Sequence, residues 1–172
     1  MKKLMILLVL AVVLTGAVAA DVSSPSWGFH FVSTDSFAPV GFGAEFFFGP
    51  VGLTGQLTFL PIGTSGAFLF LYEPAVGARF YFEPSLDNTF YVGASAHYLS
   101  AFGGDSSGTS NIPFNIIRIN AMVGFNALFG KNNDIRLAFE LGPRYNIATA
   151  SSTSDQTSWF MLHTQLMFGK IW

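Results

Sequence analysis

Segments in which apolar and polar residues alternate recur along the chain, and this pattern constrains the fold most. Successive side chains of a β-strand point to opposite faces, so strict alternation predicts strands with one apolar and one polar face. The longest example spans 117–129, where polar residues such as Arg118 and Asn120 stand between apolar neighbours. The stretch 46–72 carries no charge, but its glycines and prolines exclude a membrane-spanning helix there.

Eight alternating segments can be distinguished, and turn-forming residues separate them. The predicted strands span 26–33, 38–48, 51–60, 66–82, 90–101, 114–129, 135–147 and 158–172. The separating segments alternate between short ones, such as 49–50, and longer or more polar ones, such as 61–65 and 103–111. Hairpins that connect neighbouring strands in an up-and-down order give this alternation. Pro74 lies inside the fourth segment and predicts a bulge or an earlier strand end.

The charged side chains decide which face of the sheet looks outward. Only 10% of the chain is charged and 51% is hydrophobic, whereas a water-facing surface needs roughly 25–35% charged residues. When the apolar residues define the frame, the arginines and glutamates share the polar face: Arg79, Arg118, Arg136, Arg144, Glu45, Glu73, Glu83 and Glu140. Facing lipid, such a charge would cost about 2–4 kcal/mol at the membrane midplane. We therefore predict an all-β fold, an eight-stranded antiparallel up-and-down transmembrane β-barrel with its polar face inside.

The first twenty residues have the layout of a secretory signal peptide. Lys2 and Lys3 precede an apolar run over 4–14, and small residues follow at 17–20. The apolar run is shorter than the ~20 residues that cross a bilayer as a helix. We expect cleavage of 1–20, which leaves 21–172 as one barrel domain. The chain has no cysteine, which excludes disulfides, thiolate metal sites and a cysteine nucleophile.

Aromatic residues on the apolar face predict two belts at the membrane interfaces, as barrels in bilayers carry them. One belt lies beside the short turns and the C-terminus and contains Phe48, Phe82, Phe90, Phe129 and Trp172. The other lies toward the longer loops and contains Phe31, Phe59, Phe68 and Tyr98. Lys170 is on the apolar face but close to the end of the chain, where its ammonium can reach the interface.

The chain 21–172 resembles the small bacterial outer-membrane β-barrels of the OmpA, OmpX and opacity type. The resemblance rests on the signal peptide, the eight segments, the alternation of turns, the segment 166–172 that ends in Trp172, and a recurring Val-Gly dipeptide at 40–41, 76–77, 92–93 and 123–124. It implies location in the cell outer membrane and contact with outer-membrane lipid. It also implies that the barrel-insertion machinery recognises the C-terminal strand.

The interior of an eight-stranded barrel is just wide enough for its own side chains, so we expect a filled lumen and no open pore. Charged residues at the short-turn end predict an ion-pair network that plugs the barrel and comprises Glu45, Arg79, Arg136 and Glu140, with Arg118 and Arg144 further along. A proton or ion relay is the functional alternative to this structural role.

All three histidines, His30, His97 and His163, fall on the lumen face. His30 and His163 belong to the first and last strands, which become neighbours when the barrel closes, so these two are candidates for sharing a metal ion or a proton. We nevertheless interpret the histidines as ordinary lumen filling, and we expect no cofactor.

Catalysis is not expected. Eight-stranded lipid A deacylases use a His-x-Ser pair and a glutamate, and the nearest string here is His97-Tyr98-Leu99-Ser100. A separation of three residues puts His97 and Ser100 on opposite faces of a strand, so the histidine cannot activate that serine. A formal net charge of −2, with no cluster of basic residues, argues against a nucleic-acid partner.

We therefore expect a structural or adhesion-like surface-interaction role with an extracellular partner. The loop acids Asp35, Asp105 and Asp155 make the outer tip anionic. The alternative is binding or passage of small apolar molecules, as in OmpW-like barrels, through an upper lumen lined by Leu69, Leu71, Leu99 and Met161. A lipid A-modifying enzyme is the less favoured alternative.

Overall fold

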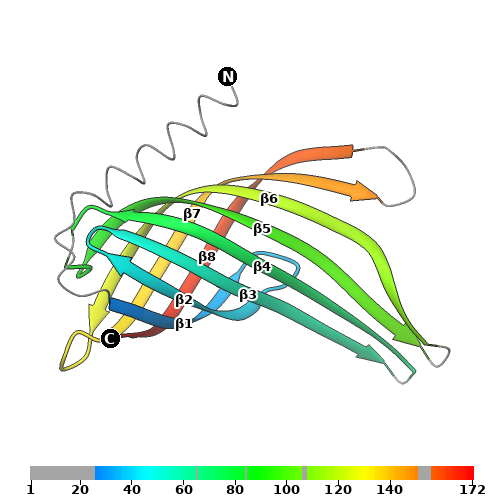
Figure 1. Cartoon of the computed structure of the whole chain (residues 1–172), viewed down its shortest axis with the longest axis horizontal. Coiled ribbons are helices and arrows are strands. Elements are labelled where there is room, and N and C mark those ends of the chain that lie inside the picture. The colour runs from blue at the N-terminus through cyan, green and yellow to red at the C-terminus, as the bar shows by residue number, and fades with distance from the viewer. Residues whose placement is uncertain (1–25, 65, 84, 106–107, 151–155) are drawn as a thin grey trace.

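The computed structural model is a closed barrel in which each strand pairs antiparallel with its neighbours in chain order, and β8 closes on β1 (Figure 1). The structure describes residues 26–172 except 65, 84, 106–107 and 151–155, so the expected signal peptide 1–20 lies outside it. The strands are β1 (Ser26–Thr34), β2 (Val40–Phe48), β3 (Val51–Thr64), β4 (Ala67–Tyr81), β5 (Thr89–Asp105), β6 (Gly108–Phe129), β7 (Ile135–Ala150) and β8 (Gln156–Ile171). The predicted fold class is thereby confirmed.

No helix in the described part of the chain is long and apolar enough to cross a membrane.

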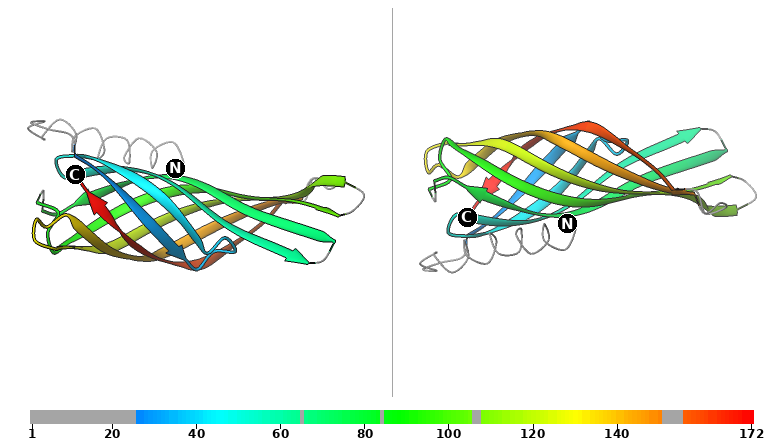
Figure 2. Two further views of the ribbon diagram at one scale, coloured as in Figure 1. Left: turned by 90° about the horizontal axis from the view of Figure 1, so that it is seen from below. Right: turned by 90° about the horizontal axis from the view of Figure 1, so that it is seen from above.

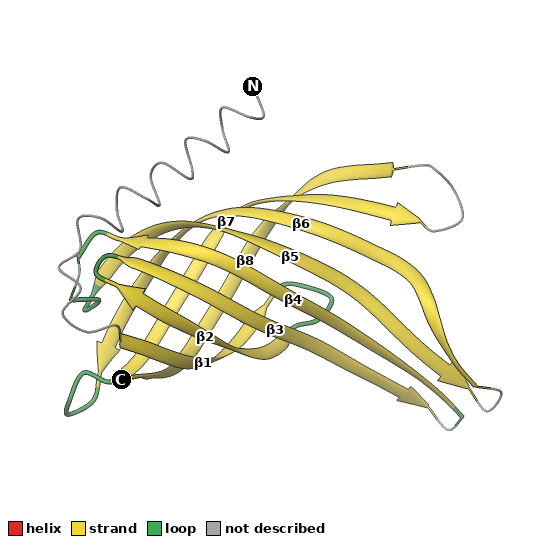
Figure 3. Cartoon of the chain, viewed as in Figure 1, coloured by secondary structure: helices red, strands yellow, loops and turns green. Residues whose placement is uncertain are grey.

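The strands differ in length, and the extra length is all at one end of the barrel. β1 and β2 have nine residues each, whereas β6 has 22. Figure 3 shows the hairpins β3–β4, β5–β6 and β7–β8 continuing past the connection between β1 and β2. Tilted strands of about 9–11 residues cross a bilayer, so the short strands mark the membrane-spanning height. We call this end, with the longer hairpins, the loop end, and the opposite end, where the C-terminus lies, the turn end (Figure 2).

The β5–β6 hairpin corrects one prediction, because the segment 103–111 is mostly strand and not loop. Gly103 pairs with Ser110, and Asp105 pairs with Gly108. Strand pairing depends on backbone hydrogen bonds and does not require apolar and polar side chains to alternate. The glycines and serines of this segment do not alternate in polarity, so the sequence pattern does not predict these strand ends. β3 also continues past its predicted end at residue 60, through Pro61 to Thr64.

Pro74 neither ends β4 nor causes a bulge in it. Pairing with β3 continues through Leu57 opposite Pro74. Pairing with β5 stops after Tyr72 opposite Ser100 and resumes with Ala75 opposite His97 in the same register. Proline has no N–H to donate to a sheet, so the ladder is interrupted without a shift.

The outer wall is apolar, and the lumen holds the four predicted arginines and three of the four predicted glutamates. The prediction for Glu83 is wrong, because β4 ends at Tyr81 and Glu83 is exposed in the turn that follows. Outward side chains such as Val76 (67% exposed) and Phe90 (64%) contrast with Arg136 and Arg144 (1% each) inside. Lys170 is the half-exposed exception, and its Nζ lies 3.2 Å from Asp134 Oδ2 at the turn end.

Apolar side chains close both ends of the lumen. At the turn end Phe47, Tyr81, Tyr91, Leu86 and Met167 belong to one buried cluster. Glycine makes room there: a Cβ at Gly124 would meet the Tyr91 ring, and one at Gly52 would meet the Glu45 carboxylate. At the loop end a second cluster comprises Ala38, Leu99 and Ile116, with Leu71, Ala148 and Trp159 packed against it.

Candidate functional site

Two groups of polar side chains fill the lumen between these apolar ends. The turn-side cluster comprises Glu45, Arg79, Tyr81, Tyr91, Asn126, Arg136 and Glu140. The loop-side cluster comprises Asp35, Ser36, Glu73, Ser95, His97, Arg118, Asn120, Arg144 and His163. Each group takes residues from several strands, because lumen-facing positions recur at every second residue around the closed sheet.

In the turn-side cluster each carboxylate contacts an arginine. Arg79 donates from Nη1 to Glu45 Oε2 at 2.8 Å and from Nε to Glu140 Oε1 at 2.5 Å. Arg136 Nη1 donates to Glu45 Oε2 at 2.6 Å. All four side chains are at most 2% exposed. Two buried cations therefore neutralise two buried anions, which is the condition under which charges are tolerated away from water.

Neutral donors and acceptors satisfy the remaining positions of this cluster. The Tyr81 hydroxyl donates to Glu45 Oε1 at 2.8 Å, and the Tyr91 hydroxyl donates to Glu140 Oε1 at 3.0 Å. Arg136 Nε donates to Asn126 Oδ1 at 2.5 Å, and the Asn126 amide donates to the carbonyl of Leu86 in the turn below. The network thus reaches from one wall of the barrel to the turn that covers its end.

The loop-side cluster is built around Glu73. Arg118 Nη1 donates to Glu73 Oε2 at 2.6 Å, and His97 Nδ1 lies 2.8 Å from Glu73 Oε1. The Ser36 hydroxyl, from the loop between β1 and β2, also bonds to Glu73. This carboxylate is 1% exposed and fully engaged.

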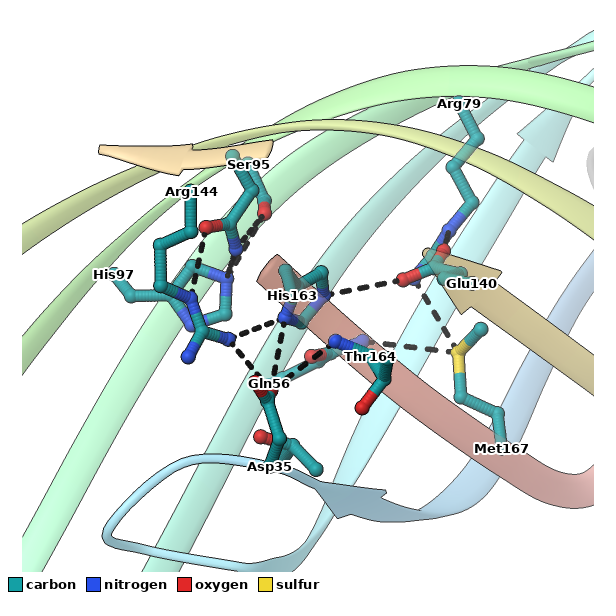
Figure 4. A network of polar contacts seen from close by, with 12 residues as sticks. Asp35, Gln56, Arg79, Ser95, His97, Glu140, Arg144, His163, Thr164 and Met167 are labelled. Carbon is teal, nitrogen blue, oxygen red and sulfur yellow. Dashed lines mark hydrogen bonds and ion pairs between the residues drawn. The ribbon is translucent and has the colours of Figure 1, made fainter. Parts of the chain in front are cut away.

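Arg144 and His163 connect the loop-side cluster to the surface (Figure 4). Arg144 Nη2 lies 3.2 Å from Asp35 Oδ1 and contacts His163 Nδ1. His163 Nε2 lies 3.9 Å from Glu140 Oε2 of the turn-side cluster. Asp35, predicted as part of the anionic outer tip, therefore pairs with a lumen arginine, and its side chain is only 28% exposed. Asp155 and the Asp105 side chain lie outside the described part of the chain.

The six residues expected in one ion-pair network fall into two. Glu45, Arg79, Arg136 and Glu140 contact one another at the turn end. Arg118 and Arg144 instead pair with Glu73 and Asp35.

The predicted proximity of His30 and His163 is wrong. In the β1–β8 ladder His30 lies opposite Gly169, six residues along the strand from His163, or roughly 20 Å at ~3.3 Å per residue. Strand neighbours in a barrel are offset in register, which the sequence does not reveal. The neighbour of His163 is instead His97, whose ring centroid lies 6.0 Å from that of His163. Within the described residues no group of three or more potential ligands could hold a metal ion.

Sequence reasoning missed the serine that contacts His97. Ser95 Oγ lies 2.9 Å from His97 Nε2. Ser95-Ala96-His97 places both side chains on one face, since residues two apart in a strand point the same way. The exclusion of Ser100 holds, because its hydroxyl donates to Asn115 Oδ1. The string Ser-x-His in the sequence could have predicted this contact.

Both aromatic belts lie on the outer wall. Phe82, Phe90, Phe129 and Trp172 are exposed at the turn end, with Phe48 partly buried beside them. Trp27 was missed as a belt residue: its ring stacks on Trp172 with centroids 4.4 Å apart. In the other belt, Phe31, Phe68 and Tyr98 are exposed and Phe59 is partly buried.

The apolar upper lumen is packed. Leu99 is fully buried in the loop-end cluster, and Leu71 packs against it. Met161 is 45% exposed, and Leu69 is partly buried.

Comparison with known proteins identifies the fold. No family model and no curated protein sequence matches the chain. The N-terminal β-barrel domain of Pseudomonas aeruginosa OprF is similar in structure, with a TM-score of 0.54 at 12% identity over 87% of this chain and 100% of that one. Neisserial surface protein A has a TM-score of 0.46 at 14% identity, over 86% of this chain and 93% of that one. Ail of Yersinia pestis, in complex with the heparin analogue sucrose octasulfate, has a TM-score of 0.44 at 15% identity, over 87% of this chain and 97% of that one. The fold is that of the small eight-stranded outer-membrane barrels, and an apolar outer wall on this fold indicates the cell outer membrane.

Proposed function

We propose that the protein is a plugged outer-membrane barrel that serves as a rigid scaffold and presents its loop-end hairpins to partners outside the cell. The observation that carries this proposal is the contrast between the nine-residue strands β1 and β2 and the 17- and 22-residue strands β5 and β6. The short strands suffice to cross the bilayer. The additional residues of β5 and β6 therefore extend a paired sheet beyond the membrane.

The plugged lumen supports a scaffold in preference to a pore. The turn-side cluster spans the interior with contacts of 2.5–3.0 Å between its charged and phenolic groups. Passage of a solute would require these ion pairs and the apolar ends to separate. Passage of small apolar molecules, the alternative considered above, would have to displace the buried Leu99 and Ile116.

The C-terminal strand supports recognition by the barrel-insertion machinery. Trp172 is 54% exposed, and its backbone pairs with Trp27 through N–O contacts of 2.8 and 3.3 Å. Trp172 therefore extends the β1–β8 junction that closes the barrel. Because the Trp172 side chain points outward, the insertion machinery could contact it on the outer face of β8 before β8 pairs with β1.

Shortening the longest hairpin tests the surface role. Residues 102–111 of β5–β6 would be replaced by an Asn-Gly turn, which suits a two-residue hairpin. A matched control would shorten the turn 130–134 at the opposite end. We expect both variants to show heat-modifiable migration and outer-membrane fractionation, while only the β5–β6 variant loses adherence of expressing cells to immobilised extracellular matrix. Unchanged adherence in the β5–β6 variant would contradict the surface role and leave a scaffold alone.

A further inference from the structure

Three side chains of the loop-side cluster form a chain of contacts that the scaffold role does not require. Ser95 Oγ lies 2.9 Å from His97 Nε2, and His97 Nδ1 lies 2.8 Å from Glu73 Oε1. Arg118 and Ser36 fix the carboxylate from its other side. A hydroxyl, an imidazole and a buried carboxylate in this order can generate a nucleophile, because the base removes the hydroxyl proton and the carboxylate stabilises the resulting imidazolium.

The neighbours of His97 determine its tautomer. Asn120 Nδ2 lies 2.9 Å from His97 Nε2, and Arg144 Nε donates to Asn120 Oδ1 at 3.2 Å. Arginine only donates, so the amide oxygen faces Arg144 and the amide nitrogen must donate to Nε2. Nε2 is therefore an acceptor and Nδ1 carries the proton that is donated to Glu73. In this tautomer the single Nε2 lone pair faces both Asn120 Nδ2 and Ser95 Oγ, so Nε2 takes the Ser95 proton when the Asn120 N–H turns from Nε2 to the Ser95 oxygen.

Asn120 also supplies a donor beside the nucleophile. Its Nδ2 lies 3.1 Å from Ser95 Oγ, and the residue is completely buried. An amide N–H held at this position can donate to an oxyanion that forms on a carbonyl attacked by Ser95. Arg144 fixes the orientation of the amide, which makes the donor preorganised.

A small cavity beside Ser95 has room for water. It measures about 10 Å³ and is lined by Ser95, Thr54, Gln165 and Glu140, among others. Thr54 Oγ1 and Gln165 Nε2 are buried and contact no hydrogen-bonding partner among the described residues. A cavity of about one probe sphere has the volume for a single water, which these two groups could bind.

The outer wall is hollowed close to the same place. An open depression of about 390 Å³ on the wall is lined by Pro74, Val76, Ala96, His97 and Tyr98, among others. It lies where Pro74 interrupts the β4–β5 ladder. Ala75 and Val76 line both this depression and the cavity beside Ser95. Separation of the strands at this interruption costs fewer backbone hydrogen bonds than elsewhere in the wall.

We propose that Ser95, His97 and Glu73 form a serine-hydrolase site that cleaves acyl esters of membrane lipids. Ser95 Oγ bonds to the ester carbonyl carbon as its proton moves to His97 Nε2, and Asn120 donates to the oxyanion. The C–O bond to the lipid alcohol then breaks, and the alcohol leaves with the proton from His97. Water in turn attacks the acyl-serine, gives its proton to His97 and releases the carboxylic acid, which regenerates Ser95. This activity goes beyond the scaffold role.

A fluorophosphonate probe tests the nucleophile in the full mature protein purified from membranes in detergent. The folded barrel should be labelled on Ser95, and Ser95→Ala should abolish the label. Ser100→Ala is the matched control, because Ser100 contacts Asn115 and not His97, and it should label like the unmodified protein. Heat-modifiable migration verifies that each variant is folded. No label on the folded protein, or an equal label on Ser95→Ala, overturns the proposal.

Further variants separate catalysis from structure. Hydrolysis of a p-nitrophenyl ester should fall about 10³-fold or more in His97→Gln, and the labelling rate should fall with it while the barrel stays folded. Glu73→Gln, at a positioning residue, should slow labelling and change its pH profile. Vesicles of phosphatidylglycerol and of lipid A then identify the source of the ester through release of fatty acid. Release from neither, or an unchanged rate in His97→Gln, contradicts the proposal.

Discussion

The turn-side and loop-side clusters lie in one lumen but solve the problem of buried charge differently. In the turn-side cluster two arginines and two glutamates neutralise one another, and all are at most 2% exposed. In the loop-side cluster Arg144 pairs with a carboxylate that is 28% exposed, and uncharged groups such as Ser95 and Asn120 contact His97. The turn side therefore holds only fully buried ion pairs, whereas the loop side adds to the buried Arg118–Glu73 pair an arginine whose carboxylate partner reaches solvent.

The largest expected effect is from Arg79→Met in the turn-side cluster. Arg79 bridges Glu45 and Glu140, so its loss leaves Glu140 without its arginine in an interior closed to bulk water. Removal of one partner of a buried pair typically costs about 3–5 kcal/mol. Urea unfolding in lipid vesicles, followed by tryptophan fluorescence, would measure the free energy of unfolding. A loss below about 1 kcal/mol would mean that water reaches this cluster.

Gly124→Ala should have the next largest effect, because the new methyl group meets the Tyr91 ring. Overpacking of this kind costs about 1–3 kcal/mol. Gly55→Ala is the matched control, since a Cβ at Gly55 meets nothing within 4 Å. The same unfolding assay should separate the two variants. Equal stability of both would show that the turn end is loosely packed.

Arg144→Met in the loop-side cluster should cost less than Arg79→Met, about 1–2 kcal/mol of unfolding free energy. Asp35 is partly exposed, so water can solvate it when the arginine is removed. The difference between the two arginine variants measures how differently the clusters exclude water. If Arg144→Met cost as much as Arg79→Met, the contrast between the clusters would fail.

Lys170→Met should have the smallest effect, within about 0.5 kcal/mol. Its side chain is 50% exposed, and its partner Asp134 is in a turn. The variant serves as the surface reference for the two lumen arginines. A loss above about 1 kcal/mol in the same assay would show that this pair is shielded from solvent.

The fold could be predicted from the sequence because the alternation of apolar and polar residues indicates which side chains share a face of the sheet. Arg118 and Asn120 stand at every second position of β6, and both are buried in the lumen. Pairing across the barrel was not accessible, because side-chain parity says nothing of register. The distance between His30 and His163 depends on that register, and so does the contact between His97 and Glu73. Strand ends composed of glycine and serine, such as 103–111, carry no parity signal and were assigned to a loop.

In the folded barrel the apolar side chains of each strand face lipid, while the alternate residues face a closed lumen. Single cysteines with spin labels at Ile117, Ile119, Ala121 and Val123, and at the intervening Asn120 and Met122, would test it directly in lipid vesicles. We predict that dissolved oxygen reaches the first set with a period of two, and that neither oxygen nor a water-soluble nickel reagent reaches the second set to a comparable extent. Quenching of the first set by the nickel reagent would contradict the account.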